Sequence, residues 1–539
     1  MKKLMQLVTV SFTFFIMCDI NAQTPTIKWW FDVKDASFGQ STAGDIDGDG
    51  KLEAVFGCYR NDSCVYALNT ENGTLLWKYN THSTYAEGCN DVAPVIYDLD
   101  RDDSLEVIVP SSCNNKTFCF NGATGQTKWI CDTRGSDSPP TLADINGDDI
   151  PDILHGEFGG YVICINGANG TPLWEIPVDL NSWIQTAPTL VDLDNDTQLD
   201  FVVATWNNVD KDSNAIYAYR CSDQSLIWKY YISDVVYHGT AVANLDHDAF
   251  PELIIGCYND TLYCLNGENG TVKWKYASDY YIGSPASIAD VDGDDDCDVI
   301  FTSFNKVIAL TSVGLFKWEY TIPNAEQSFR GCALADINND FLLDVVFGTD
   351  GGKVIALNGF NGTELFTVDL ALHYGNDLFA IDHAPLIADF DNDDTLEIFI
   401  VGGYATYPDF ENNFGRAYLI KAGKGSGPEW LMFQQDIHRK SSLCEKPFTS
   451  IHEKPLSNTA PVKVFPNPAK DFITFYLPKT ENEIYSLTIF NSLGQQIHKI
   501  ENISSTEISI QTENWSKSFY FFKIQDKKGN ISQGKFIFE

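Results

Sequence analysis

The stretch Asp290-Val-Asp-Gly-Asp-Asp-Asp-Cys-Asp298 places carboxylates at positions 1, 3, 5 and 9 of one tight loop. Oxygen side chains at this spacing can surround one small cation, and a set of hard carboxylate ligands favours Ca²⁺. The pattern occurs eight times, at intervals of 46 to 53 residues, and each copy keeps an oxygen side chain at all four positions. A single acidic turn would be an ordinary solvated turn, but eight copies in register predict metal loops.

Each loop is preceded and followed by a short apolar run, such as residues 286–289 before the quoted loop. Both flanks are therefore expected to be strands, and each loop is a hairpin turn rather than an EF-hand. The predicted calcium ligands are Asp45, Asp47, Asp49, Glu53, Asp98, Asp100, Asp102, Glu106, Asp144, Asn146, Asp148, Asp152, Asp192, Asp194, Asp196, Asp200, Asn244, Asp246, Asp248, Glu252, Asp290, Asp292, Asp294, Asp298, Asp336, Asn338, Asp340, Asp344, Asp389, Asp391, Asp393 and Glu397.

Every repeat continues with a strand, a turn, a further strand, an Asn-Gly or related turn and a last strand that reaches an aromatic residue. Asn-Gly pairs favour hairpin turns because they accept positive φ. The aromatic position is occupied by Trp77, Trp129, Trp174, Trp228, Trp274, Trp318, Phe366 and Trp430. Four antiparallel strands repeated eight times predict an all-β fold, an eight-bladed β-propeller, with seven blades as the alternative.

The strand over residues 27–33, with Trp29 and Trp30, precedes the first loop and resembles the last strand of a repeat. Two arrangements are open. It can pair into the last blade beside the Trp430 segment, so that both ends of the repeat region close the ring. Alternatively, the Trp430 segment is the outer strand and the leading strand only flanks it.

The composition narrows the class of partners. The chain has 74 acidic and 36 basic residues, a formal charge of -38, so nucleic acid and anionic membranes are not expected partners. Met1-Lys-Lys followed by the apolar run 4–17 predicts a secretory signal cleaved after Ala22, and no later segment is long and apolar enough to span a membrane.

The cysteines leave two possibilities open. The pairs Cys58/Cys64, Cys113/Cys119 and Cys257/Cys264 flank predicted turns and can form cross-strand disulfides or remain small buried thiols. Cys297 occupies a place that other repeats fill with Leu or Pro, and we interpret it as a packing position.

The repeats, over residues 27–445, resemble those of two known families. Segments such as Leu265-Asn-Gly-Glu-Asn-Gly-Thr-Val-Lys-Trp274 resemble the blades of PQQ-type propellers, in which tryptophans dock neighbouring blades. The acidic loops resemble the FG-GAP repeats of integrin α-subunits and bacterial surface proteins, which bind calcium between the first two strands. The adjacent cysteines that stack on the quinone in many PQQ enzymes are absent, so PQQ is not an expected cofactor.

Beyond the repeats, the marks Phe465-Pro-Asn-Pro-Ala469, Tyr485–Gln495 and Gly534-Lys-Phe-Ile-Phe538 resemble the C-terminal sorting domain of type IX secretion. The resemblance implies a small β-sandwich, handling by the type IX secretion machinery, export across the outer membrane and a cell-surface or extracellular location. We therefore expect a signal peptide over residues 1–22, a propeller over 23–445, a linker over 446–461 and a sorting domain over 462–539.

Strand order places the acidic loops on one face of the ring and the links between blades on the other. Aromatic residues on the second face could contact a ligand, or could pack beneath the links. The candidates are Tyr85, Trp183, Trp206, Tyr237, Tyr281 and Phe329. No catalytic residue is assigned, and the lone histidines 155, 238, 373 and 383 are expected to be structural.

These observations favour a binding or adhesion module for a glycan or a surface protein, with structural calcium, over an enzyme. The alternative is a polysaccharide lyase that resembles the rhamnogalacturonan lyases built on a calcium-bearing propeller. That chemistry needs a base and a cation beside a sugar C5, for which the second face offers His238, Arg330 and His383.

Overall fold

The computed structural model describes residues 24–82, 89–408 and 410–444, and in the C-terminal part 463–465, 469–470, 472–477, 485–490, 496–511, 515, 517–526 and 531–538. Contacts divide the chain into two compact units, Met1–Lys446 and Pro447–Glu539. The predicted signal over 1–22, the predicted linker over 446–461 and Tyr85 lie outside the described residues.

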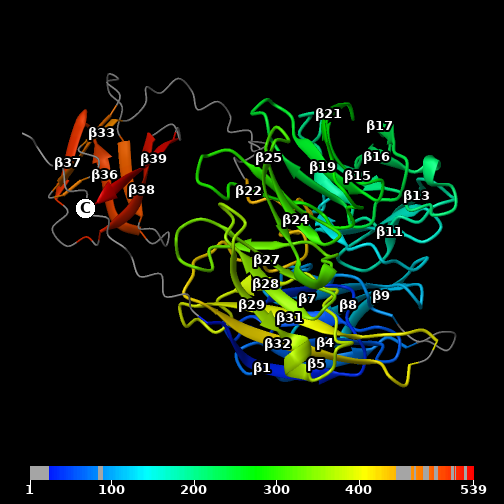
Figure 1. Ribbon diagram of the computed structural model, residues 1–539. Helices are drawn as coiled ribbons and strands as arrows, with labels where there is room; N and C mark the ends of the chain where they lie inside the picture. The colour runs from blue at the N-terminus through cyan, green and yellow to red at the C-terminus, as the bar shows by residue number, and fades with distance from the viewer. Residues whose placement is uncertain are drawn as a thin grey trace, which may run out of the picture. The chain divides into compact units, whose positions relative to one another are not determined.

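In the first unit, eight antiparallel sheets of four strands are arranged as a propeller (Figure 1), which confirms the all-β, eight-bladed prediction. Blades one to four are β2 (Ser41–Gly44), β3 (Glu53–Gly57), β4 (Cys64–Asn69) and β5 (Thr74–Asn80); β6 (Val95–Tyr97), β7 (Glu106–Ser111), β8 (Lys116–Asn121) and β9 (Thr127–Asp132); β10 (Thr141–Ala143), β11 (Asp152–Glu157), β12 (Tyr161–Ile165) and β13 (Pro172–Pro177); and β14 (Thr189–Val191), β15 (Asp200–Ala204), β16 (Ala215–Arg220) and β17 (Leu226–Tyr231).

Blades five to seven are β18 (Thr240–Ala243), β19 (Glu252–Cys257), β20 (Thr261–Asn266) and β21 (Val272–Ala277); β22 (Ser287–Ala289), β23 (Asp298–Ser303), β24 (Lys306–Thr311) and β25 (Phe316–Thr321); and β26 (Ala333–Ala335), β27 (Asp344–Gly348), β28 (Lys353–Leu357) and β29 (Glu364–Asp369). Blade eight contains β30 (Leu386–Ala388), β31 (Leu396–Tyr404) and β32 (Phe414–Gly423). Short helices occur in the connections: η1 (Lys211–Ser213), η2 (Pro323–Ala325) and α1 (Leu370–Tyr374).

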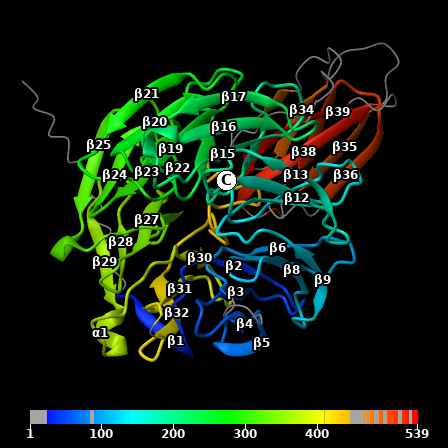
Figure 2. The same cartoon turned by 90° about the vertical axis from the view of Figure 1, so that its right-hand side faces the viewer.

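The leading strand β1 (Thr26–Val33) completes blade eight by pairing antiparallel with β32, so one end of the ring is sealed by the other (Figure 2). Trp29 on β1 donates from Nε1 to the Thr70 carbonyl of blade one, at 2.6 Å. Our assignment of Trp430 to this docking position was therefore wrong. Trp430 lies outside the fourth strand because the chain turns back to the ring axis after β32, where Trp430 pairs with Ile387 of the innermost strand.

Docking tryptophans join neighbouring blades in one repeated contact. The indole Nε1 donates to a backbone carbonyl of the next blade from Trp29, Trp77, Trp129, Trp228, Trp274 and Trp318. The ring also presses on the glycine of that blade's turn: a Cβ on Gly125 would lie 2.7 Å from the Trp77 ring, and its φ is +67°. The Gly that ends this turn therefore serves both the hairpin and the contact between blades.

After β32, residues 425–444 run along the innermost strands, and we call them the axial segment (Figure 2). Backbone hydrogen bonds join it to blades one, three, four, five, six, seven and eight, through Ala43, Leu142, Leu190, Val242, Ile288, Asp336 and Ile387. Arg439, fully buried, donates to Pro94 O of blade two, Pro140 O of blade three and Phe433 O of the segment itself. The axial segment therefore contacts every blade.

A disulfide joins Cys297, in the acidic loop of blade six, to Cys444 at the end of the axial segment. Interpreting Cys297 as a packing position was wrong, because its partner lies in a segment that no repeat contains. The members of the three adjacent pairs considered above, including Cys58 and Cys64, are free thiols, all but Cys113 buried.

The second unit is the predicted β-sandwich. One sheet is formed by β33 (Lys463–Phe465), β34 (Phe472–Tyr476) and β37 (Glu507–Gln511), and the other by β36 (Gln496–Ile503), β35 (Tyr485–Phe490), β38 (Ser518–Asp526) and β39 (Ile531–Phe538). Side chains from both sheets share one core, in which Phe475 meets Phe522 at 5.0 Å between ring centroids.

Candidate functional site

The acidic loops connect the first and second strands of each blade and bring their oxygens together. In blade one, ligand atoms of Asp45, Asp47 and Glu53 all lie within 4.8 Å of one another. Further groups of this kind are formed by Asp98, Asp100 and Glu106; Asp192, Asp194 and Asp196; Asp246, Asp248 and Glu252; and Asp290, Asp292 and Asp294. The distances match what a single cation between these oxygens requires.

The ninth loop position lies at the start of the second strand and is buried in every blade. Its carboxylate accepts the backbone N–H of the second loop residue, as Glu53 does from Ile46 at 3.0 Å and Glu106 from Leu99 at 2.8 Å. Burial, followed by the charges of Asp47, Asp49 and Asp45, raises the pKa of Glu53 to about 8. A bound cation would offset this repulsion and stabilise the ionised form.

Several loop oxygens are buried and have no hydrogen-bond partner among the described residues. They are Asp45 Oδ1, Glu53 Oε1, Asp98 Oδ1, Asp194 Oδ1, Asp200 Oδ1, Asn244 Oδ1, Asp292 Oδ1 and Asp391 Oδ1. Buried acceptors left unsatisfied are costly, so these atoms mark places for a positively charged ligand. The donor set, hard oxygens only, fits Ca²⁺.

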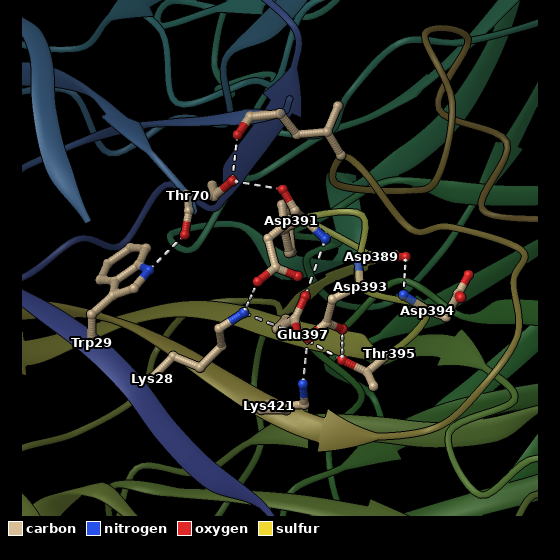
Figure 3. Close-up of polar contacts among 12 residues, drawn as sticks. Lys28, Trp29, Thr70, Asp389, Asp391, Asp393, Asp394, Thr395, Glu397 and Lys421 are labelled. Atoms are coloured by element: carbon tan, nitrogen blue, oxygen red, sulfur yellow. Dashed lines mark hydrogen bonds and ion pairs between the residues drawn. The ribbon is translucent and has the colours of Figure 1, made fainter. Parts of the chain in front are cut away.

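Basic side chains, which the sequence reasoning missed, contact several loops. In blade eight, Lys28 pairs with Asp391 and, at 3.4 Å, with Glu397 (Figure 3). Lysines 128, 273 and 317 make the corresponding pairs in blades two, five and six. The signal was present in the sequence, because each of these lysines immediately precedes a docking tryptophan.

The opposite face, which we call the open face, carries a continuous row of aromatic side chains. Trp206 meets Tyr237 at 5.0 Å and Tyr258 at 5.4 Å, Tyr258 stacks on Tyr281 at 4.9 Å, and Tyr237 meets Phe329 at 5.3 Å. We call these five residues the aromatic arc. All are half-buried, so each retains some exposure to solvent.

One aromatic candidate, Trp183, lies at the edge of this arc. Trp183 is 46% exposed, packs on Phe158 at 4.8 Å and pairs through its backbone with Trp206, so it extends the arc at one end. Tyr258 was missed because it lies in the turn between the second and third strands of blade five, not before a first strand.

Arg330 occupies the centre of the open face and is almost completely buried. Its Nη1 donates to His238 Nε2 at 2.7 Å, and its Nε pairs with Asp382 Oδ1 at 3.3 Å. The guanidinium also lies over the rings of Tyr237 and Phe329, 5.3 and 5.4 Å from their centroids. His238 donates from Nδ1 to the Gly283 carbonyl at 2.7 Å, and burial together with Arg330 holds its pKa well below the usual value. His238 is therefore a neutral, structural group.

Each of the other predicted structural histidines has a ring nitrogen within hydrogen-bond distance of a hydroxyl group. His155 Nε2 lies 2.9 Å from Thr117 Oγ1, and His383 Nε2 lies 3.0 Å from Ser41 Oγ. Burial lowers the pKa of His155 to about 4 and that of His383 to about 3. His373 Nδ1 lies 3.2 Å from the Tyr418 hydroxyl.

Acidic groups gather beside this centre. Gln185 Nε2 donates to Asp137 Oδ2 at 3.2 Å, while Asp137 Oδ1 is buried without a partner. Burial and then the charge of Asp91 raise the pKa of Asp137 well above its usual value. A pocket of about 320 Å³ opens nearby, with Tyr281, Phe329 and Asp382 in its wall. The open face thus combines aromatic surfaces with polar atoms that lack partners.

The ring and its two faces define the class, a β-propeller with acidic hairpin loops, followed by a separate β-sandwich. The profile of the family described as outer membrane protein assembly factor BamB matches residues 13–230 and 159–371. Since these matches cover more than half of the chain, the protein belongs to this family of PQQ-like propellers. Residues 463–539 match the secretion system C-terminal sorting domain.

Solved structures share the propeller fold at low identity. The quinohemoprotein alcohol dehydrogenase of Comamonas testosteroni is 12% identical, with a TM-score of 0.53 over 76% of this chain and 78% of that one. The Vibrio cholerae biofilm matrix protein Bap1 is 14% identical, with a TM-score of 0.51 over 76% and 94%. Saccharomyces cerevisiae Sqt1 is 12% identical, with a TM-score of 0.52 over 74% and 99%. No curated protein sequence matches the chain.

The sorting domain indicates export by type IX secretion to the cell surface or the extracellular space. Among the described residues, no helix has the length and apolar character needed to cross a membrane. The protein is therefore a secreted BamB-like propeller with a type IX sorting tail.

Proposed function

We propose that the protein is a calcium-stabilised binding module that holds a neutral glycan on its open face. The observation that carries this proposal is the aromatic arc beside Arg330, His238 and Asp137. Binding sites for small ligands combine apolar and aromatic walls with a few convergent polar groups, and the open face has this composition. Sugar rings present apolar C–H faces to aromatic rings and hydroxyls to polar side chains.

The charges of the open face favour a neutral ligand over an acidic one. Two carboxylates, Asp91 and Asp382, and the carboxyl group of Asp137, whose pKa is raised, surround one guanidinium, that of Arg330. Arg330 is already paired with Asp382, so little positive charge remains for a uronate. The Asp137 carboxyl group can instead form hydrogen bonds with sugar hydroxyls through its unpartnered Oδ1.

No observation favours the lyase alternative. His238 uses both ring nitrogens within the protein, and Arg330 has its own partners, so neither is positioned as a base or as a free cation for C5 proton abstraction. A protein ligand on the same surface is an outcome that the experiment below distinguishes.

Calcium has a structural role in this proposal. The acidic loops lie on the face opposite the aromatic arc, and several of their buried oxygens lack hydrogen-bond partners among the described residues. Extracellular sites commonly have dissociation constants of about 0.1 to 1 mM, so millimolar calcium stabilises each occupied site by about 1 kcal/mol. Residues of the first, third, fifth and ninth loop positions, as in Asp45, Asp47, Asp49 and Glu53, would hold the ion.

The test is a glycan array probed with the purified secreted chain in millimolar calcium and again with a chelator. We expect retention of a neutral glycan that is weakened about fivefold in each of Trp206→Ala and Tyr237→Ala, because a stacking contact is worth about 1 kcal/mol. Phe341→Ala is the matched control, since Phe341 is 84% exposed in an acidic loop of the other face.

Three results would contradict the proposal. Equal binding by the arc variants and the control would place the ligand elsewhere. Release of unsaturated, ultraviolet-absorbing products would establish the lyase. Silence on the array combined with capture of a defined surface protein would establish a protein ligand.

A further inference from the structure

The eight acidic loops are not equivalent, because the chain supplies its own positive charge to some of them. In blades two, five, six and eight, Asp at the third loop position is accompanied by Lys before the docking tryptophan. The ammonium lies between the third and ninth positions, as Lys317 does in blade six, 2.7 Å from Asp298 and in contact with Asp292.

Blades three and seven show the complementary combination. Asn146 and Asn338 occupy the third position, and Leu173 and Leu365 occupy the place of the lysine. The Asn146 amide takes the place of the ammonium: its Nδ2 donates to Asp148 at 3.1 Å and to Asp152 at 3.2 Å. In these six blades the third loop position and the residue before the docking aromatic change together. Asp at the first occurs with Lys at the second, and Asn occurs with Leu, as expected if one side chain compensates the charge of the other.

Blade four reaches the same result from another strand. The residue before its docking tryptophan is Ile227, but Arg220 at the end of β16 pairs with Asp194 and, at 2.7 Å, with Asp196. A side-chain cation is thus paired with the loops of blades two, four, five, six and eight.

Blade one is the exception. It has Asp47 at the third position and Leu76 before Trp77, and among the described residues no Lys or Arg forms an ion pair with any of its four carboxylates. Glu53 is fully buried, its Oε1 lacks a hydrogen-bond partner, and Asp45 Oδ1 is unpartnered as well. Both side chains belong to the group whose ligand atoms lie within 4.8 Å of one another.

We propose that the blade-one loop is the principal divalent-cation site of the protein, and that the ammonium or guanidinium groups take over part of the ion's role in the blades that carry them. This inference rests on the calcium binding proposed above and adds which loop binds most tightly. Calcium affinity rises with the number of charged ligands, and blade one combines four carboxylates with no internal counter-charge. A lysine beside the site opposes a divalent ion by direct repulsion.

The experiment is calorimetric titration of calcium into the chelator-treated full secreted chain and four variants. Leu76→Lys gives blade one the lysine of blades two, five, six and eight, and we expect the tightest site to weaken by at least about tenfold. Asp47→Asn, which copies blades three and seven, is expected to weaken the same site without adding a long side chain. Leu173→Lys, the matched control in blade three, leaves the tightest site unchanged. Lys317→Leu is expected to create a second tight site in blade six.

The outcomes separate this inference from the calcium proposal beneath it. If the unaltered chain binds no calcium, both fail. If it binds calcium but Leu76→Lys and Asp47→Asn, verified as folded by their melting curves, leave the tightest site unchanged, only the assignment to blade one fails. A tight site that is lost in Leu173→Lys would likewise overturn it.

Discussion

The two faces of the ring differ in how they use the repeat. On the loop face, every blade presents an acidic hairpin at the same place, and the ninth-position carboxylate accepts the equivalent backbone N–H, as Glu53 and Glu397 do. On the open face, the links differ from blade to blade, and the aromatic arc is confined to blades four to seven. The repeated face therefore carries the features of cation sites, and the irregular face carries the features of a ligand site.

Removing calcium should affect the loop face most. We expect chelation to lower the free energy of unfolding by roughly 3 to 6 kcal/mol, about 1.4 kcal/mol for each of two to four loops occupied at ten times their dissociation constant. Thermal and urea unfolding with calcium and with chelator measure this. Magnesium at the same concentration should restore little, because it demands a smaller octahedral site. Identical unfolding curves in calcium and chelator would remove the proposed distinction between the faces.

The axial segment gives the second largest effect. Arg439→Met is expected to cost about 3 kcal/mol, because it leaves the buried carbonyls of Pro94, Pro140 and Phe433 without a donor. Urea unfolding monitored by tryptophan fluorescence measures the loss. Lys440→Met, the adjacent half-buried position, is the control, and an equal loss there would show that the segment, and not the Arg439 network, sets the stability.

Substituting two glycines of similar φ separates the cost of disturbing a contact between blades from the cost of the backbone conformation alone. Gly125→Ala places a Cβ 2.7 Å from the Trp77 ring and should cost about 2 to 4 kcal/mol. Gly147, in the acidic loop of blade three, has φ +79° and open space around it, so Gly147→Ala should cost only about 1 kcal/mol. If urea unfolding shows the same loss of free energy of unfolding for both variants, the contact between Gly125 and the Trp77 ring contributes nothing beyond the backbone strain.

The smallest expected effect concerns the open face and is measured as the pH dependence of thermal stability. Because the folded chain holds the pKa of Asp137 above its unfolded value, the stability that Asp137 contributes falls as pH rises from about 4 toward that folded pKa. Asp137→Asn lacks this proton, so its Tm should exceed the wild-type Tm by a margin that grows with pH. Asp210→Asn, at an exposed position, is the control. A difference that does not change with pH for Asp137→Asn would mean that Asp137 is not held in a protonated form.

The repeated part of the fold was predictable because its sequence pattern occurs eight times. The spacing of the acidic loops and the turns before Trp77 and its equivalents predicted eight blades, as the structure shows. The axial segment was not predictable, since it occurs once and makes its hydrogen bonds with strands far away in sequence. The misassignment of Trp430 and of Cys297 has this single cause.

The candidate site was predictable in part for the same reason. Tyr237, Tyr281 and Phe329 recur before first strands, so their common face followed from strand order, and the structure brings them together with Trp206. Their partner Tyr258 and the pairing of Arg330 with His238 are contacts between different blades. Such contacts depend on how neighbouring blades tilt, which no local pattern specifies.

The Cys297–Cys444 bond determines where a mechanical pull on the C-terminal tail enters the ring. Without it, tension on the chain beyond Cys444 would act on the axial segment and detach its hydrogen bonds one after another, as a zipper opens. With it, tension passes through the sulfur bridge into the acidic loop of blade six, whose strands are paired side by side. If the exported protein is held at a surface by its tail, the tension would therefore act on the ring through blade six. The axial segment would not bear this tension.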